Sequence, residues 1–209
     1  MTRAMIYTRF ERFWHWSQAV LILGLLFTGF EVHGSYGALG FGTAARLHTL
    51  AAWLLVALWV FVIFWFAVTG EWRQFLPTTD RLGAVIRYYL VGTFTGEPHP
   101  FRRTTRAKHN PLQRLTYLVL KLAITPLVWA SGLLYLFYNR WAHTGFAGLE
   151  LGTVALVHTA AAFLMLAFVI AHVYMATMGR TMFSLLRPMI TGYEDGERAD
   201  GASAPADPE

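Results

Sequence analysis

Four long apolar stretches limit how this chain can fold. They cover residues 13–32, 47–68, 112–138 and 149–178, and each reaches the roughly 20 helical residues that cross a hydrocarbon core. The chain has 56% apolar and only 14% charged residues, whereas soluble domains are about 25% charged. The sequence therefore predicts an all-α integral membrane protein, with a four-transmembrane-helix bundle formed by residues 1–192.

Positive charge predicts how the spans are oriented. Of the 17 Lys and Arg residues, only Arg46, Arg140 and Lys121 lie outside the N-terminal segment, the loop between the second and third spans and the C-terminal segment. The positive-inside rule places that loop and both termini on the cytoplasmic side of a bacterial inner membrane. The charges flank apolar runs, so membrane lipid and not nucleic acid is the expected partner. Lys121, inside the third span, either snorkels to the interface or pairs with an acidic group of a cofactor.

The loop between the second and third spans is expected to contain an interfacial amphipathic helix. Its apolar residues follow helical spacing at Leu82, Val85, Ile86, Tyr89 and Leu90. Thr79 or Asp80 is the expected N-cap, and the helix should end near Gly92. Residues 193–209 are rich in acidic residues, Ala, Gly and Pro and are expected to form a disordered cytoplasmic tail.

Cysteine is absent, which excludes iron–sulfur clusters, disulfides and covalent haem attachment on this chain. A metal or cofactor must therefore be held by His, Met or oxygen ligands. Of the eight histidines, those in the spans or at their ends are His15, His48, His158 and His172. One ionisable residue at membrane depth can simply bond a neighbouring helix, so the arrangement of the four matters more than any one of them.

The predicted topology sorts these histidines into two levels. His15 and His172 lie toward the cytoplasm, and His48 and His158 lie toward the periplasm. The 14 residues from His158 to His172 span about 21 Å of helix and leave the two side chains roughly 40° apart. One ion cannot bind all four imidazoles. Two imidazoles at each level suit two haems ligated from both sides, which favours simple one-electron transfer.

Several other residues could serve either a cofactor or the fold alone. Arg12 and Arg46 lie within a helical turn of His15 and His48, and they either pair with haem propionates or only set the topology. Four glycines either admit a macrocycle or serve ordinary helix packing, namely Gly24, Gly29, Gly132 and Gly152. The remaining histidines, which are His33, His99, His109 and His143, are expected to be solvated or interfacial.

Five motifs follow one another along the chain up to about Pro188. They are Arg12-Phe-Trp-His15-Trp16, Arg46-Leu-His48, Gly70-Glu-Trp-Arg-Gln-Phe-Leu-Pro77, Lys108-His-Asn-Pro-Leu-Gln-Arg114 and the pair His158 and His172. In this order and spacing they resemble the di-haem cytochrome b subunits of membrane-bound formate dehydrogenases, thiosulfate reductases and nickel–iron hydrogenases. Pro111 and Leu112 depart from the formate dehydrogenase pattern and favour the thiosulfate-reductase-like branch.

The resemblance implies two haem b groups, one held by His15 and His172 on the cytoplasmic side and one by His48 and His158 on the periplasmic side. It further implies a quinone pocket beside the cytoplasmic haem, where Asn110, Gln113 and His172 are candidate contacts. Asn110 also fits the N-cap of the third span.

The implied function is electron transfer between the quinone/quinol pool and a partner redox subunit of a respiratory oxidoreductase. That partner would be a molybdoenzyme, hydrogenase or multihaem cytochrome, and the substrate chemistry would belong to it. The alternatives are a stand-alone cytochrome b561-like quinone oxidoreductase and a haem-free membrane anchor. The long basic loop and the Gly70–Pro77 motif favour a docked partner over the stand-alone oxidoreductase.

Overall fold

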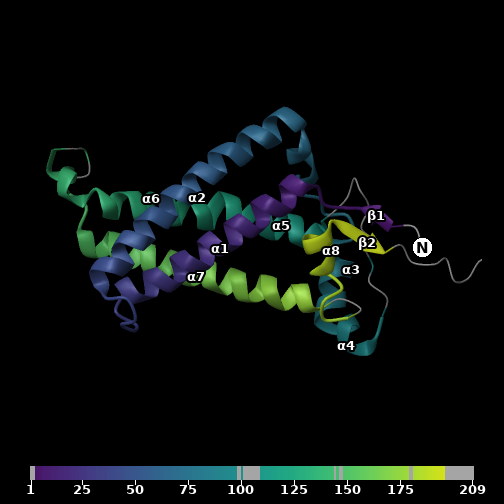
Figure 1. Cartoon of the computed structure of the whole chain (residues 1–209). Coiled ribbons are helices and arrows are strands. Elements are labelled where there is room, and N and C mark those ends of the chain that lie inside the picture. The colour runs from purple at the N-terminus through teal and green to yellow at the C-terminus, as the bar shows by residue number, and fades with distance from the viewer. Residues whose placement is uncertain are drawn as a thin grey trace, which may run out of the picture.

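The computed structural model describes residues 3–97, 100, 109–143, 145, 148–178 and 181–195. Four long helical rods form the main body of the described residues (Figure 1). They are α1 (Arg9–Val32), α2 (Phe41–Thr69), the joined elements α5 (Pro111–Val119), η3 (Leu120–Ile124) and α6 (Thr125–Leu136), and α7 (Leu151–Thr177). Helix α1 packs mainly on α2, and α6 packs mainly on α7. The predicted all-α four-helix bundle is therefore confirmed.

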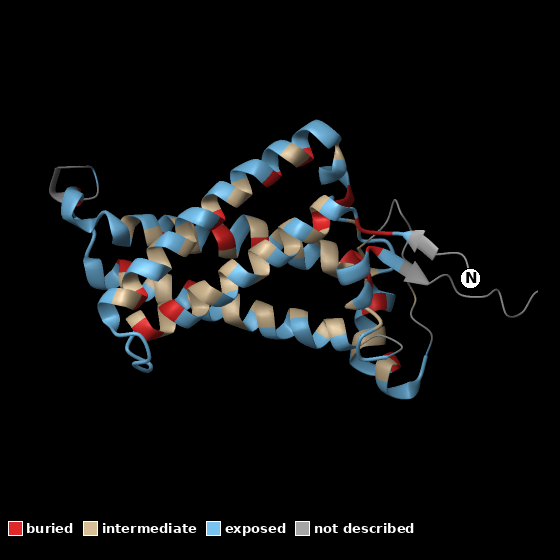
Figure 2. Cartoon of the chain, in the orientation of Figure 1, coloured by how far each residue is buried: buried red, intermediate tan, exposed pale blue. Residues whose placement is uncertain are grey.

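The outer surface of the four rods is apolar. Val20, Leu156 and Ile170 are 68%, 70% and 61% exposed, and exposed and half-buried positions dominate the rods (Figure 2). All four are long and apolar enough to cross a membrane. In water this surface would drive aggregation, whereas lipid tails cover it in a bilayer and the helices satisfy their own backbone groups. The chain is a multi-pass membrane protein.

The third rod is not one regular helix. A π-helical turn at Leu120–Ile124 separates α5 from α6, just before Pro126. Proline has no backbone N–H and its ring crowds the carbonyl four residues earlier, which for Pro126 is that of Leu122. A widened turn is a common way to accommodate this defect. The apolar pattern predicted the span but not this break.

One end of the bundle holds the N-terminal segment, the segment between α2 and α5, and the C-terminal segment (Figure 1). We call it the basic end. Strand β1 (Arg3–Met5) pairs there with the antiparallel strand β2 (Tyr193–Asp195). The prediction of a disordered tail from Tyr193 is thus wrong for these three residues, and residues 196–209 lie outside the described residues. The prediction came from the composition of the tail. In the structure, helix α8 (Arg187–Thr191) ends at Gly192, whose φ of +89° turns the chain toward β1.

The long connection at the basic end begins with a tight turn. Helix α2 stops at Gly70, with φ +73°, and η1 (Glu71–Phe75) follows as a 3₁₀ turn. Gln74 is buried and its amide nitrogen donates to Glu71 at 3.0 Å and to Glu11 of α1 at 3.5 Å. The Gly70–Pro77 motif therefore ties the end of α2 to the start of α1.

The predicted amphipathic helix is present as α3 (Leu82–Arg87), η2 (Tyr88–Gly92) and α4 (Thr93–Thr95). Its N-cap is Arg81, at φ +56°, and neither Thr79 nor Asp80. Thr79 instead accepts a backbone bond from Leu82 at 3.0 Å, which makes the segment before the helix a turn. The helix also continues past Gly92 and ends at Gly96, with φ +74°.

Some apolar residues of this helix pack against the bundle, and others are exposed. Val85 is fully buried against the bundle, whereas Leu90 and Phe94 are 70% and 73% exposed. Exposed apolar residues beside a basic loop fit a helix that lies on the membrane surface. Its interfacial position remains a prediction.

At the end away from the basic end, Glu31 closes the link between α1 and α2. Glu31 is 4% exposed, and its carboxylate accepts the backbone N–H groups of Leu39 and Gly40, each at 2.6 Å. A 3₁₀ turn, η4 (Tyr138–His143), follows α6 at the same end. We call this end the opposite end.

Candidate cofactor site

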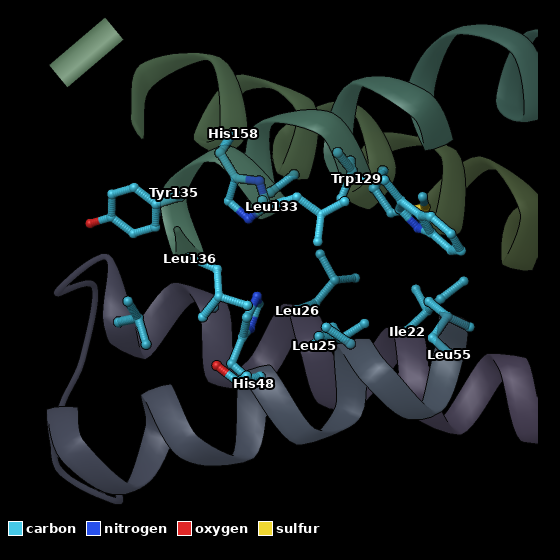
Figure 3. Close-up of a pocket in the computed structure, with 18 of the residues that line it drawn as sticks. Ile22, Leu25, Leu26, His48, Leu55, Trp129, Leu133, Tyr135, Leu136 and His158 are labelled. Atoms are coloured by element: carbon cyan, nitrogen blue, oxygen red, sulfur yellow. The ribbon is translucent and has the colours of Figure 1, made fainter. Parts of the chain in front are cut away.

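The imidazoles of His48 and His158 meet inside the bundle near the opposite end. His48 comes from the second turn of α2 and His158 from the second turn of α7. Their ring centroids are 6.2 Å apart and the ring planes are at 80°. The two side chains extend toward each other from facing walls of one pocket (Figure 3).

A hydroxyl group from a neighbouring helix contacts each of these rings. The Nδ1 atom of His48 is 3.1 Å from the hydroxyl of Thr28 on α1. The Nδ1 atom of His158 is 3.0 Å from the hydroxyl of Ser131 on α6. In both rings Nδ1 is thus engaged, which leaves Nε2 for another ligand.

Glycine lets the rings lie against helix backbone. A Cβ on Gly29 would be 3.0 Å from Cε1 of His48, and one on Gly132 would be 3.1 Å from Cε1 of His158. Among the described residues, Gly24 and Gly152 have no such neighbour within 4 Å. Of the four glycines with two readings, only Gly29 and Gly132 serve a close approach, and what approaches is the histidine ring.

The rings of His48 and His158 line a cavity of about 610 Å³ between the α1/α2 and α6/α7 pairs. This volume falls within the range of roughly 300–1,000 Å³ found for small-molecule and cofactor sites. The cavity extends from Phe41 at the opposite end to Gln18, which lies about one helical turn short of His15. The indole nitrogen of Trp59 is buried in its wall without a hydrogen-bond partner among the described residues. The pocket is therefore mainly apolar, with a few polar atoms turned inward.

His15 and His172 form a second facing pair nearer the basic end. Their ring centroids are 6.1 Å apart and the planes are at 45°. Trp16 contacts the His15 ring edge-on at 5.2 Å, and Phe168 stacks on His172 at 5.9 Å. Nδ1 of His15 is buried and has no hydrogen-bond partner within the described part of the chain. The structure thus brings the four histidines together in the two pairs expected from topology.

These separations suit one metal ion between the rings of each pair. Two imidazoles that bind an ion from opposite sides at about 2.0–2.1 Å per bond have centroids roughly 6 Å apart. Across the described ranges, no three His, Cys, Asp or Glu side chains gather closely enough to hold an ion by themselves. A macrocycle that brings four nitrogens of its own completes such a two-imidazole site, so the donor set fits haem.

The two arginines beside the histidines have different surroundings. Arg12 donates to the backbone carbonyl of Ile190 at 2.6 Å, and it therefore holds α8 against α1. Arg46 is exposed at the start of α2. The geometry gives Arg12 a structural contact and leaves propionate pairing as a prediction for both.

Asn110 and Gln113 form the start of α5. The side-chain oxygen of Asn110 accepts the backbone N–H of Gln113 at 2.8 Å, and that of Gln113 accepts the backbone N–H of Asn110 at 3.0 Å. Asn110 is 3% exposed and its amide nitrogen also donates to Tyr89 at 3.2 Å. The predicted N-cap before Pro111 is confirmed as a complete capping box.

We expect Asn110→Ala to destabilise the start of α5. Loss of an Asn N-cap costs about 1 kcal/mol, so the midpoint of thermal unfolding in detergent should fall. Asn110→Ser keeps an oxygen for the Gln113 N–H and should recover most of the loss. An alanine variant as stable as the original would show that the box is unimportant.

An aromatic cluster surrounds Lys121 near the basic end. Its ammonium nitrogen lies 3.8 Å from the centroid of the Phe75 ring and 5.8 Å from that of Phe66. His109 stacks on Phe75 and meets Tyr117 edge-on, each at 5.1 Å. Lys121 is therefore held by cation–π contacts. His109 is half-buried among these rings, so it is not fully solvated, and the interfacial position expected as the alternative remains a prediction.

The other predicted surface histidines are only partly described. His33 is exposed, with its ring 3.4 Å from the hydroxyl of Ser35. His99 lies outside the described residues, as does the side chain of His143. Sequence reasoning missed Thr28 and Ser131 altogether, and the signal that could have found them is a hydroxyl residue directly before a glycine in each of two spans.

Comparison with known proteins identifies the family of the chain. The family described as prokaryotic cytochrome b561 matches residues 6–192. A protein of Escherichia coli (strain K12) named as a candidate cytochrome, YdhU, is 33% identical over 193 residues, which cover 90% of this chain and 73% of that protein. No solved structure matches the chain.

The family match spans every transmembrane rod and all four paired histidines. Membership implies that the chain binds haem b, in keeping with the two-imidazole sites described above. The chain therefore belongs to the prokaryotic cytochrome b561 family and is a membrane cytochrome b with a role in electron transfer.

Proposed function

We propose that this chain transfers electrons through two b-type haems between membrane quinone and a partner redox subunit. The observation that carries the proposal is the pair of facing imidazoles at each of two depths in one bundle. Helix α7 supplies one imidazole to each pair, which separates the two sites by about 21 Å along its axis. Two one-electron carriers at these depths bridge most of a hydrocarbon core about 30 Å thick.

Each histidine pair has a defined role in this proposal. His15 and His172 hold the haem nearer the basic end, and His48 and His158 hold the haem nearer the opposite end. When bound, haem supplies an iron that gains and loses a single electron. The two imidazoles of each pair would hold the iron and would favour simple one-electron transfer over reaction with oxygen or substrates.

In this proposal the basic end lies on the cytoplasmic side of a bacterial inner membrane. Among the described residues of that end, the cations include Arg9, Arg73, Arg87 and Arg114. A Lys and Arg excess of this kind beside membrane spans is typical of the cytoplasmic side. Both termini are then cytoplasmic, and the His48 and His158 pair lies toward the periplasm.

Quinone reacts near the basic end, beside the His15 and His172 pair. Gln113 is half-buried at the start of α5, at the basic end, and the hydrogen bonds of its side chain within the described residues do not use its amide nitrogen. This donor suits a quinone carbonyl. We retain Gln113 and His172 as quinone contacts. Asn110 also stays a candidate contact, because its amide nitrogen has a second hydrogen besides the one that it donates to Tyr89.

A catalytic redox subunit completes the proposed assembly. It would be a molybdoenzyme, a hydrogenase or a multihaem cytochrome, and the substrate chemistry would be its own. The long basic segment between α2 and α5 supports a docked partner, because a small-molecule reductase needs no such extended surface. Affinity purification from native membranes should therefore recover a redox protein with this chain.

The proposal is tested by the pigment of the purified chain. Detergent extracts from cells supplied with haem should contain two haem b per chain by the pyridine haemochrome assay. The haems should be reduced by quinol. A colourless preparation would favour the haem-free anchor, and quinol-dependent activity without any co-purifying redox protein would favour the stand-alone oxidoreductase.

The glycine contacts give a matched pair of variants. Gly29→Ala places a methyl group 3.0 Å from Cε1 of His48, whereas Gly24→Ala on the same helix meets nothing within 4 Å. We expect the first variant to lower haem content toward one per chain, because its methyl group displaces the imidazole. The second should keep two. Equal haem contents in both variants would contradict the role given to His48.

A further inference from the structure

The hydroxyl contacts of His48 and His158 define which ring nitrogen carries the proton. The Thr28 hydroxyl has one hydrogen, and it lies 2.7 Å from the carbonyl oxygen of Gly24, which can only accept. With that hydrogen directed at the carbonyl, the Thr28 oxygen acts as the acceptor toward Nδ1 of His48, at 3.1 Å. Nδ1 of His48 carries the hydrogen, and its Nε2 presents a lone pair to the cavity.

The same arrangement occurs on the facing wall. The Ser131 hydroxyl donates to the carbonyl oxygen of Leu127 at 2.6 Å and accepts from Nδ1 of His158 at 3.0 Å. Helices α1 and α6 therefore present the same two groups in the same order. In each helix a side-chain hydroxyl bonds Nδ1 of the histidine, and the residue after it is a glycine whose backbone contacts the imidazole ring.

We propose that Thr28 and Ser131 are positioning residues that fix the tautomer and the plane of the two imidazoles near the opposite end. This inference rests on the proposed function, since it concerns the haem between His48 and His158. A ring that donates its Nδ1 hydrogen is a more basic ligand through Nε2. The more basic ligand stabilises the oxidised metal and lowers its reduction potential.

The pair formed by His15 and His172 serves as a comparison within the same chain. Nδ1 of His15 has no hydroxyl partner within the described residues, and its ring meets that of His172 at 45° instead of 80°. Loss of a hydroxyl at position 28 or 131 should therefore affect one haem and spare the other. A general effect on folding would affect both.

The test uses isosteric variants of the full chain in detergent. Thr28→Val and Ser131→Ala remove the hydroxyl, and Thr28→Ser restores it at position 28. Thr116→Val is the matched control, because Thr116 also bonds the carbonyl four residues earlier, at 2.9 Å, but has no paired histidine beside it. Redox titration gives the potential of each haem, and EPR of the oxidised protein reports the angle between its two imidazole planes.

We expect Thr28→Val and Ser131→Ala to shift the potential of one haem to more positive values. The EPR signal of the near-perpendicular pair should change with it, while the other haem keeps both its potential and its signal. Thr28→Ser and Thr116→Val should match the original protein. If Thr28→Val loses both haems and so reports only misfolding, Ser131→Ala, which removes a single oxygen atom, decides by the same two measurements.

Unchanged potentials and EPR signals in Ser131→Ala, or an identical shift of both haems, would overturn the positioning role while leaving the proposed function intact. Failure of the proposed function looks different, because the original protein itself would then lack two haems.

Discussion

Replacing His158 with alanine should reduce the haem content from two per chain to one. His158 supplies one of the two imidazoles near the opposite end, and its partner His48 cannot ligate an iron from both sides alone. The pair formed by His15 and His172 is about 21 Å away along α7 and should keep its haem. The pyridine haemochrome assay measures the ratio, and redox titration should show one component in place of two.

The control for this variant is His33→Ala. His33 is exposed at the end of α1 and its ring faces Ser35, not another imidazole. It should retain two haems. Two haems in the His158 variant would refute the assignment of His158, and none in it would show that the two sites do not fill independently.

Both histidine pairs could be predicted from the sequence because their positions depend on coarse properties. The apolar spans set the number of crossings, the cation bias sets their direction, and helical rise converts residue numbers into depth. These three steps place His48 beside His158 and His15 beside His172 without any knowledge of side-chain packing. Errors of one or two residues at helix ends do not change the result.

Contacts that depend on how helices rotate against one another were not predictable in this way. Thr28 bonds the carbonyl of Gly24 within its own helix, as Thr commonly does in membrane helices, so apolar periodicity does not reveal its second contact with His48. The glycine that follows Thr28 is the local sign of that contact. The break before Pro126 and the strand at Tyr193 were missed for a related reason. Each depends on a local backbone feature, whereas apolar periodicity and composition average over many residues.

Replacing His15 with alanine should uncouple the protein from quinol. In the proposed function quinol reacts at the basic end, where His15 and His172 form the pair. Without that haem, electrons would have to cross about 21 Å to the remaining site in one step. Quinol should therefore reduce the remaining haem at least about a hundredfold more slowly than in the original protein, a rate ratio equivalent to roughly 2.7 kcal/mol. Stopped-flow absorbance measures this rate.

Comparison of the two alanine variants separates electron entry from haem binding. Each should contain one haem, and dithionite, which needs no quinone site, should reduce that haem fully in both. Quinol should reduce it rapidly only in the His158 variant, because that protein keeps the pair at the basic end. The reverse pattern would place the quinone site at the opposite end and would overturn the proposed direction of the electron path, while leaving both histidine pairs in place as haem ligands.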